Sequence, residues 1–91
     1  MIQPLAPLRA EIDALDDQII ALLTQRMAVA HRVAAVKRAH CIPVVIPERV
    51  AAVLDRAAAV GAAAGLDPDY LRRLYRVIID ETCRVEETLV G

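Results

Sequence analysis

The chain has 91 residues, of which 57% are hydrophobic and 2% aromatic, so there is room for one domain, residues 1–91, with an aliphatic core. Its formal net charge is −1, so the chain lacks the excess of basic residues that is typical of nucleic-acid-binding proteins. Every run of 18 residues includes at least one charged residue. We therefore predict no nucleic-acid partner and no membrane span. Two cysteines, Cys41 and Cys83, and no apolar leader predict a cytoplasmic protein without disulfides, in which both thiols are packing residues.

The first predicted helix occupies most of the segment between Pro7 and Pro43, which contains neither proline nor glycine. Aliphatic residues recur along it at intervals of three and four, as one face of a helix requires. We call this row the long-helix seam, and it consists of Leu8, Ile12, Leu15, Ile19, Leu22, Val29 and Val33.

A second, shorter helix is predicted after the segment 41–47. Pro43 and Pro47 interrupt the long helix, and Pro47 suits the first position of the next one. We expect this second helix to loosen at Gly61 and Gly65.

A third helix is predicted to begin at Pro68 and to run to about Leu89. Asp67 is a favourable N-cap, and proline is favoured at the first helical position that follows it. The sequence therefore predicts an all-α fold with one long and two shorter helices per chain.

The length of the first helix predicts a dimer. A helix of about 35 residues is about 52 Å long, whereas a compact domain of this size is roughly 30 Å across. One copy cannot cover the long-helix seam, and soluble monomers avoid apolar patches of that size. We therefore predict an obligate two-fold homodimer in which the long helices pack against each other and against the shorter helices.

Two basic residues continue the long-helix seam at positions where aliphatic residues are expected. Arg26 follows Leu22 by four residues and Lys37 follows Val33 by four, which places both cations on nearly one face, roughly 16 Å apart. They either set the register of the helices or line an anion pocket, because both side chains bind carboxylates. Arg9 lies about 25 Å before Arg26, so it reaches such a pocket only in the partner of an antiparallel dimer.

Two polar residues, Thr82 and Glu86, lie one turn apart on the predicted third helix, at or beside its apolar face. They are either a threonine bonded to its own helix and a solvated glutamate, or two groups of the same pocket. The histidines His31 and His40 lack metal-ligand spacing with any cysteine or carboxylate, so we predict structural roles for them and no metal.

Taken together, these residues resemble the all-α chorismate mutase family over nearly the whole chain. The resemblance rests on spacing along all three predicted helices, which chance similarity between helical bundles does not reproduce. It is carried by Leu8-Arg9, Ile12-Asp13, Leu15-Asp16, Ile19, Leu22-Leu23, Arg26, Val33, Lys37, Pro43-Val44, Glu48-Arg49, Gly65 to Pro68, Tyr70 and Ile78 to Thr82.

The resemblance implies an enzyme that rearranges chorismate to prephenate in an intertwined homodimer, without cofactor or metal. By the family pattern, Arg26 and Arg9 of the second chain hold the two carboxylates of this small dicarboxylate substrate in a reactive chair. Lys37 donates to the ether oxygen, where negative charge develops in the transition state. Arg49 borders the pocket, and Thr82 contacts the substrate.

Two positions depart from the pattern of chorismate mutases. Many members have a glutamine that donates to the ether oxygen where this chain has Glu86, which donates only when protonated. We expect burial to keep Glu86 neutral and activity to fall as the pH rises. Chorismate mutases usually have a glutamate for the C4 hydroxyl where this chain has Val50, which weakens discrimination for chorismate.

Chorismate mutase is the predicted function, with Lys37, Glu86 and Arg26 as the catalytic residues, and three alternatives stay open. The start of the second helix, residues 46–54, resembles isochorismate-pyruvate lyases. An ionised Glu86 facing a C4 ammonium suits a 4-amino-4-deoxychorismate mutase. The third alternative is a non-enzymatic helical dimerisation or regulatory module, in which Arg26 and Lys37 only set register.

Overall fold

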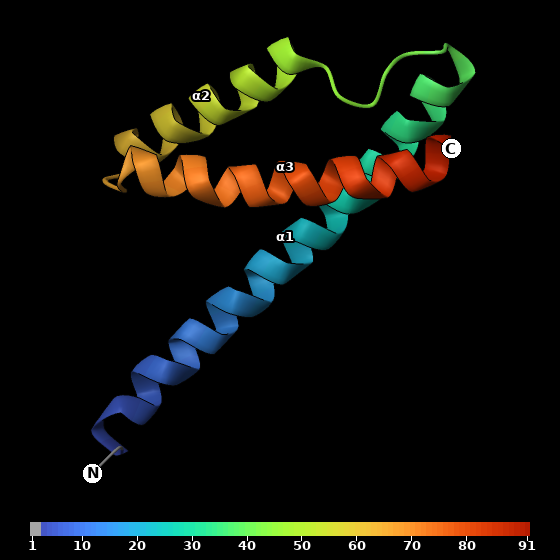
Figure 1. Ribbon diagram of the computed structural model, residues 1–91. Helices are drawn as coiled ribbons and strands as arrows, with labels where there is room; N and C mark the ends of the chain where they lie inside the picture. Colours follow the sequence, from blue (N-terminus) through green and yellow to red (C-terminus); the bar gives the residue numbers. More distant parts are fainter. Residues whose placement is uncertain (1–2) are drawn as a thin grey trace.

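The computed structural model describes residues 3–91, which form three α-helices after one turn of 3-10 helix, with no strand in that range (Figure 1). The 3-10 turn η1 spans Gln3–Leu5, α1 spans Ala6–Ala39, α2 spans Pro47–Ala63 and α3 spans Pro68–Val90. The predicted all-α fold with one long and two shorter helices is confirmed.

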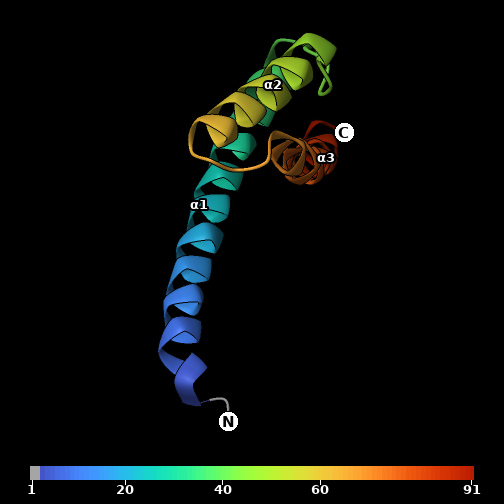
Figure 2. The same ribbon diagram turned by 90° about the vertical axis from the view of Figure 1, so that its left-hand side faces the viewer.

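The single chain is elongated. Helix α3 packs against both α1 and α2, and the N-terminal half of α1 extends away from the other two helices (Figures 1 and 2). The molecule measures 57 × 24 × 16 Å, and its radius of gyration of 16.7 Å exceeds the roughly 12 Å of a compact domain of this length. The buried aliphatic core is correspondingly small and consists of Ala30, Ala34, Val44, Ala57, Ala58 and Ile79.

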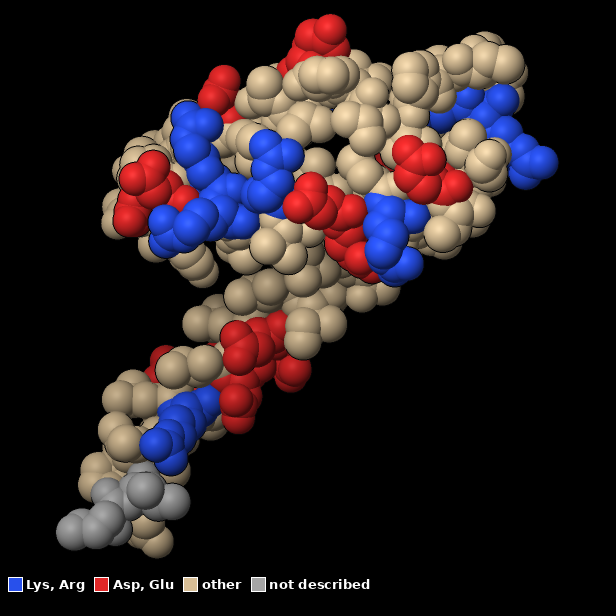
Figure 3. Space-filling view, viewed as in Figure 1, with Lys and Arg blue, Asp and Glu red and all other residues tan. Residues whose placement is uncertain are grey.

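The long-helix seam is uncovered in the single chain. Every seam residue from Leu8 to Leu22 is between 54% and 63% exposed. By length and hydropathy alone, the segment Gln3–Ala39 also passes the test for a membrane-spanning helix, contrary to our expectation from charge spacing. Acidic and basic side chains nevertheless lie along the extended half of α1 (Figure 3), which favours a helix covered by another protein surface over one that faces lipid.

The predicted helix starts are confirmed. Helix α2 begins at Pro47 and α3 at Pro68, as the preference of proline for the first turn of a helix indicates. The side chain of Asp67 caps α3 by accepting a 2.9 Å hydrogen bond from the backbone N–H of Asp69.

Gly61 lies inside α2, so the expectation that the helix loosens there is wrong. The residue is buried, and a Cβ atom at this position would lie 2.5 Å from Cγ of Leu71 on α3. The helix ends at Ala63, and two residues later Gly65 has a φ of +88°, the left-handed conformation that glycine tolerates. Gly61 therefore allows α2 and α3 to approach closely.

Replacing Gly61 with alanine is expected to lower the free energy of unfolding by about 1–3 kcal/mol, because the added methyl group overlaps Leu71. Chemical denaturation at a fixed protein concentration measures the change. Adding Leu71→Ala should cost less stability in the Gly61→Ala protein than in the parent, because it relieves the overlap. Equal costs in the two proteins would show that the contact is not tight.

Cys41 is exposed, so the expectation that both cysteines are packing residues is wrong for this one. Its φ of +54° places it in the left-handed region directly after α1, where glycine is preferred. The turn is closed by a 2.9 Å hydrogen bond from the N–H of Ile42 to the carbonyl of Lys37. Both cysteines are free thiols.

Replacing Cys41 with glycine is expected to stabilise the protein by about 0.5–1 kcal/mol, since the strain relieved exceeds the added flexibility of the unfolded chain. Thermal unfolding at a fixed protein concentration would show a higher midpoint. The control is Cys41→Ala, which keeps a Cβ atom in the left-handed conformation and should not gain this stability. A gain of equal size in both variants would attribute the effect to loss of the thiol.

Candidate functional site

A cavity of about 390 Å³ lies between the C-terminal half of α1, the start of α2 with the segment leading into it, and α3. This volume is typical of small-molecule sites. Its wall combines aliphatic side chains with a few polar ones, and it is formed by Arg26, Val29, Ala30, Val33, Lys37, Val44, Ile46, Arg49, Val50, Val53, Ile79, Thr82, Cys83 and Glu86. All the site residues predicted from the sequence line it except Arg9.

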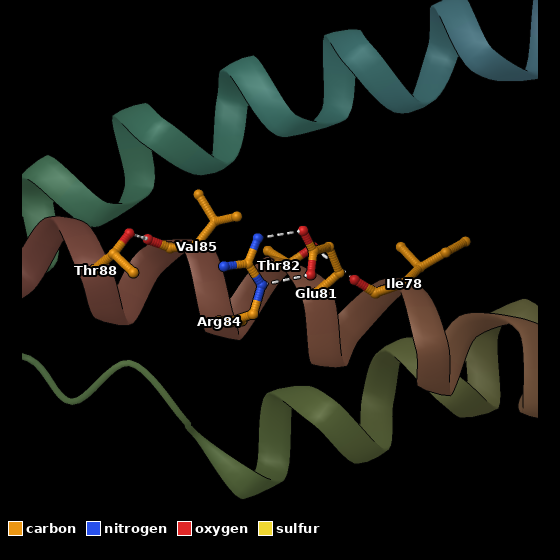
Figure 4. A network of polar contacts seen from close by, with 6 residues as sticks. All are labelled: Ile78, Glu81, Thr82, Arg84, Val85 and Thr88. Carbon is orange, nitrogen blue, oxygen red and sulfur yellow. Dashed lines mark hydrogen bonds and ion pairs between the residues drawn. The ribbon is translucent and has the colours of Figure 1, made fainter.

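Arg26 and Thr82 join α1 to α3 at the cavity. Nη1 of Arg26 donates a 2.7 Å hydrogen bond to Oγ1 of Thr82, and that hydroxyl donates to the carbonyl of Ile78 at 2.8 Å. Figure 4 shows the second of these bonds along α3. The hydroxyl of Thr82 bonds to its own helix, as one of the two interpretations holds, and it also accepts from Arg26 on the cavity wall. The remaining N–H groups of the guanidinium are available to a carboxylate.

The surface of α3 beside Thr82 carries an ion pair of its own. Nη2 and Nε of Arg84 donate to the carboxylate of Glu81 at 2.7 Å, as Figure 4 shows. This hydrogen bond lowers the pKa of Glu81. Neither residue lines the cavity, so the pair belongs to the exposed face of α3.

Lys37 and Glu86 form an ion pair within the cavity. Nζ of Lys37 donates to Oε1 of Glu86 at 2.7 Å and to the backbone carbonyl of Val44 at 2.7 Å. The side chains of Lys37 and Glu86 are only 13% and 6% exposed, so water screens their charges weakly. The contact links α1 to α3 and to the connection before α2.

The expectation of a neutral Glu86 did not include an ion-pair partner. Burial, on which the expectation rested, is confirmed, since Glu86 is 4% exposed. The sequence did not reveal that the buried partner is Lys37, 49 residues away along the chain.

Arg9 lies outside the cavity of its own chain. It is an exposed residue of the first turns of α1, about 25 Å along the helix from Arg26. The extended half of α1 points away from α2 and α3 (Figure 1), and the residues of α1 that line the cavity lie between Arg26 and Lys37. As predicted from helix length, Arg9 cannot serve the site of its own chain.

Two groups of the site were not predicted from the sequence. The Val44 carbonyl binds Lys37, and Cys83 lies on the cavity wall. Burial raises the pKa of the Cys83 thiol, and the negative charge of Glu86 raises it further, so the thiol is neutral at physiological pH. Within residues 3–91, no group of three or more His, Cys, Asp and Glu side chains is arranged to hold a metal ion.

Comparison with known families agrees with this geometry. The sequence profile of the family described as chorismate mutase type II matches residues 8–87. The chain belongs to the chorismate mutase type II family. The match includes all three helices that form the cavity, so the cations and hydroxyl that line it lie within the family domain of this chorismate mutase homologue.

Relatives within the chorismate mutase family differ in the substrate that their names specify. The 4-amino-4-deoxychorismate mutase of Streptomyces venezuelae is 44% identical over 84 residues, which is 92% of this chain and 82% of that protein. The enzyme of the same name from Streptomyces pristinaespiralis is 42% identical over 88 residues, 97% and 68% of the two chains. The bifunctional chorismate mutase/prephenate dehydratase of Escherichia coli is 34% identical over 87 residues, 96% of this chain and 22% of that protein.

Proposed function

We propose that this chain is a cytoplasmic mutase that rearranges a chorismate-class dicarboxylate, and that its preferred substrate is 4-amino-4-deoxychorismate. The observation that carries the proposal is the pairing of Arg26 with Thr82 and of Lys37 with Glu86 around one cavity in a chain of this family. Such a site fits a reaction that needs positioned charges and no covalent intermediate.

The proposed mechanism assigns separate tasks to the cations. Arg26 binds one substrate carboxylate, and Arg9 of a second chain binds the other, so that the enolpyruvyl arm is held over the ring. Lys37 donates to the ether oxygen as its bond to the ring breaks and negative charge grows on it. Thr82 keeps Arg26 in place, and Arg49 borders the mouth of the cavity.

The homodimer is part of this proposal. The uncovered seam on the extended half of α1 needs a partner surface, and a second copy offers an equally long uncovered seam. Antiparallel packing of two α1 helices would carry Arg9 of each chain towards the cavity of the other. Two equivalent sites with residues from both chains would result.

Two residues support the amino substrate. Val50 lines the cavity and offers no acceptor to a C4 hydroxyl. The amine of 4-amino-4-deoxychorismate is attached to the ring carbon next to the one that bears the ether oxygen. The carboxylate of Glu86 lies 2.7 Å from the ammonium of Lys37, the proposed donor to the ether oxygen, so it is within reach of this amine as well and pairs with its ammonium form.

Chorismate is the second candidate substrate. The name of the family and the 34% identity to the bifunctional Escherichia coli protein favour it. Comparing kcat/KM for the two substrates tests the proposal, and the amino compound is expected to give the higher value. A higher kcat/KM for chorismate would overturn the substrate assignment but leave the mutase assignment intact.

Glu86→Gln is expected to shift the substrate preference towards chorismate by at least about 10-fold in the ratio of kcat/KM values. The amide cannot pair with an ammonium as a carboxylate does, but it can donate to the ether oxygen. Steady-state kinetics with both substrates measures the ratio. Glu87→Gln, at an exposed position outside the cavity, is the control and should leave the ratio unchanged. An unchanged ratio in Glu86→Gln would remove Glu86 from substrate selection.

A further inference from the structure

The connection between α1 and α2, residues 40–46, forms hydrogen bonds with both the backbone carbonyl and the side-chain ammonium of Lys37. The N–H of Ile42 donates to the backbone carbonyl of Lys37 at 2.9 Å, which closes the turn at the end of α1. Two residues further on, the carbonyl of Val44 accepts a 2.7 Å hydrogen bond from Nζ of the same lysine. The backbone and the side chain of Lys37 are thus fixed by one short segment.

The position of Val44 is itself well determined. The residue is 7% exposed and lies on the cavity wall. Pro43 before it and Pro47 at the start of α2 restrict the backbone of the connection. Its carbonyl is therefore a rigid acceptor.

The number of donors on Lys37 makes these contacts significant. An ammonium group has three N–H bonds. One points to Glu86 and one to Val44, which leaves a single N–H on a side chain that lines the cavity. With only one fixed acceptor, the ammonium could rotate and present no N–H in a constant direction.

We propose that the backbone carbonyl of Val44 is a positioning group, which together with Glu86 orients the Lys37 ammonium so that its third N–H points to the reacting oxygen of the substrate. This inference rests on the proposed function, because it assigns a purpose to that N–H. The orientation of the ammonium is a property of the ligand-free protein and is measurable without any substrate. Preorganisation of this kind is effective because the donor need not reorient during the reaction.

The direct test makes the backbone carbonyl of Val44 a weaker hydrogen-bond acceptor and leaves all side chains unchanged. Placing the 2-hydroxy acid analogue of valine at position 45 in a synthetic chain turns the Val44 carbonyl into an ester carbonyl, which is a weaker acceptor. Within residues 3–91, the N–H of Val45 makes no hydrogen bond to other protein groups, so its loss removes none. The matched control is the same replacement at position 44, which weakens the carbonyl of Pro43 instead.

Lys37 offers a selective probe, because it is the only lysine among the 91 residues. Labelling with ¹⁵N-lysine gives one ammonium signal, and its relaxation reports how freely the group moves. The ester at position 45 is expected to increase this motion and to lower kcat about 10-fold, with KM changed much less. The ester at position 44 is expected to change neither.

Pro43→Gly, which can be expressed, is the second variant. It loosens the connection without removing a group of the site, so the ammonium should again become more mobile. An ammonium whose relaxation is unchanged in both the position-45 ester and Pro43→Gly overturns the proposal. Equal kcat values for the two esters also overturn it, even where the ammonium moves more freely. If the parent protein rearranges neither substrate, the proposed function fails, and the relaxation data alone decide whether Val44 orients Lys37.

Discussion

Lys37→Met is expected to lower kcat by about 10²–10³-fold, because it removes the donor proposed to stabilise charge on the ether oxygen. Methionine keeps an unbranched side chain of similar length, so the packing around α1 changes little. Steady-state kinetics with chorismate and with 4-amino-4-deoxychorismate measures the loss. Arg38→Met is the matched control, since Arg38 is the next basic residue of the same helix and lies outside the cavity.

A loss of stability in Lys37→Met must be separated from a loss of catalysis. Removing Lys37 leaves the buried carboxylate of Glu86 without its partner, which typically costs about 3–5 kcal/mol. Adding Glu86→Gln removes that unpaired charge and should restore stability but not activity. Recovery of activity along with stability in the double variant would show that Lys37 has a structural role only.

Mixing Arg9→Ala with Arg26→Ala protein is expected to restore activity that neither variant has alone. Each change should lower kcat/KM by at least about 100-fold, because each removes one of the two carboxylate-binding groups. In a mixed dimer, one of the two sites has Arg26 from one chain and Arg9 from the other. With random pairing, half of the dimers are mixed, so about 25% of the parent activity should return.

The control for this experiment pairs Arg26→Ala with Lys37→Met. Both residues line the cavity of a single chain, so each site in the mixed dimer lacks one of them and activity should stay low. The fraction of mixed dimers is measured by native mass spectrometry. No recovery in the Arg9→Ala and Arg26→Ala mixture, with mixed dimers present, would contradict a site shared between chains.

The helices and most of the cavity wall were predictable because they depend on local rules. Pro47, Pro68 and the Asp67 cap define helix starts in any context. Helix periodicity placed Arg26 and Lys37 on one face, and they line one cavity. The rise of the helix, about 25 Å between Arg9 and Arg26, excluded Arg9 from that cavity.

The contacts that depend on tertiary structure were not predictable. The partner of Glu86 is on another helix. The group that binds Lys37 is the backbone carbonyl of Val44, and because every residue has such a carbonyl, the residue type at this position did not predict the contact. The left-handed conformation of Cys41 contradicts the usual preference for glycine. Gly61 was interpreted by its low helix propensity, whereas its close contact with Leu71 explains why glycine is there.

Product analysis by ¹H NMR tests the central claim most directly. The purified protein is incubated separately with 4-amino-4-deoxychorismate, chorismate and isochorismate. The account predicts rapid formation of 4-amino-4-deoxyprephenate, slower formation of prephenate, and no salicylate. Salicylate and pyruvate from isochorismate, with neither prephenate product, would contradict it in favour of a lyase. No conversion of any of the three would favour a non-enzymatic dimerisation module.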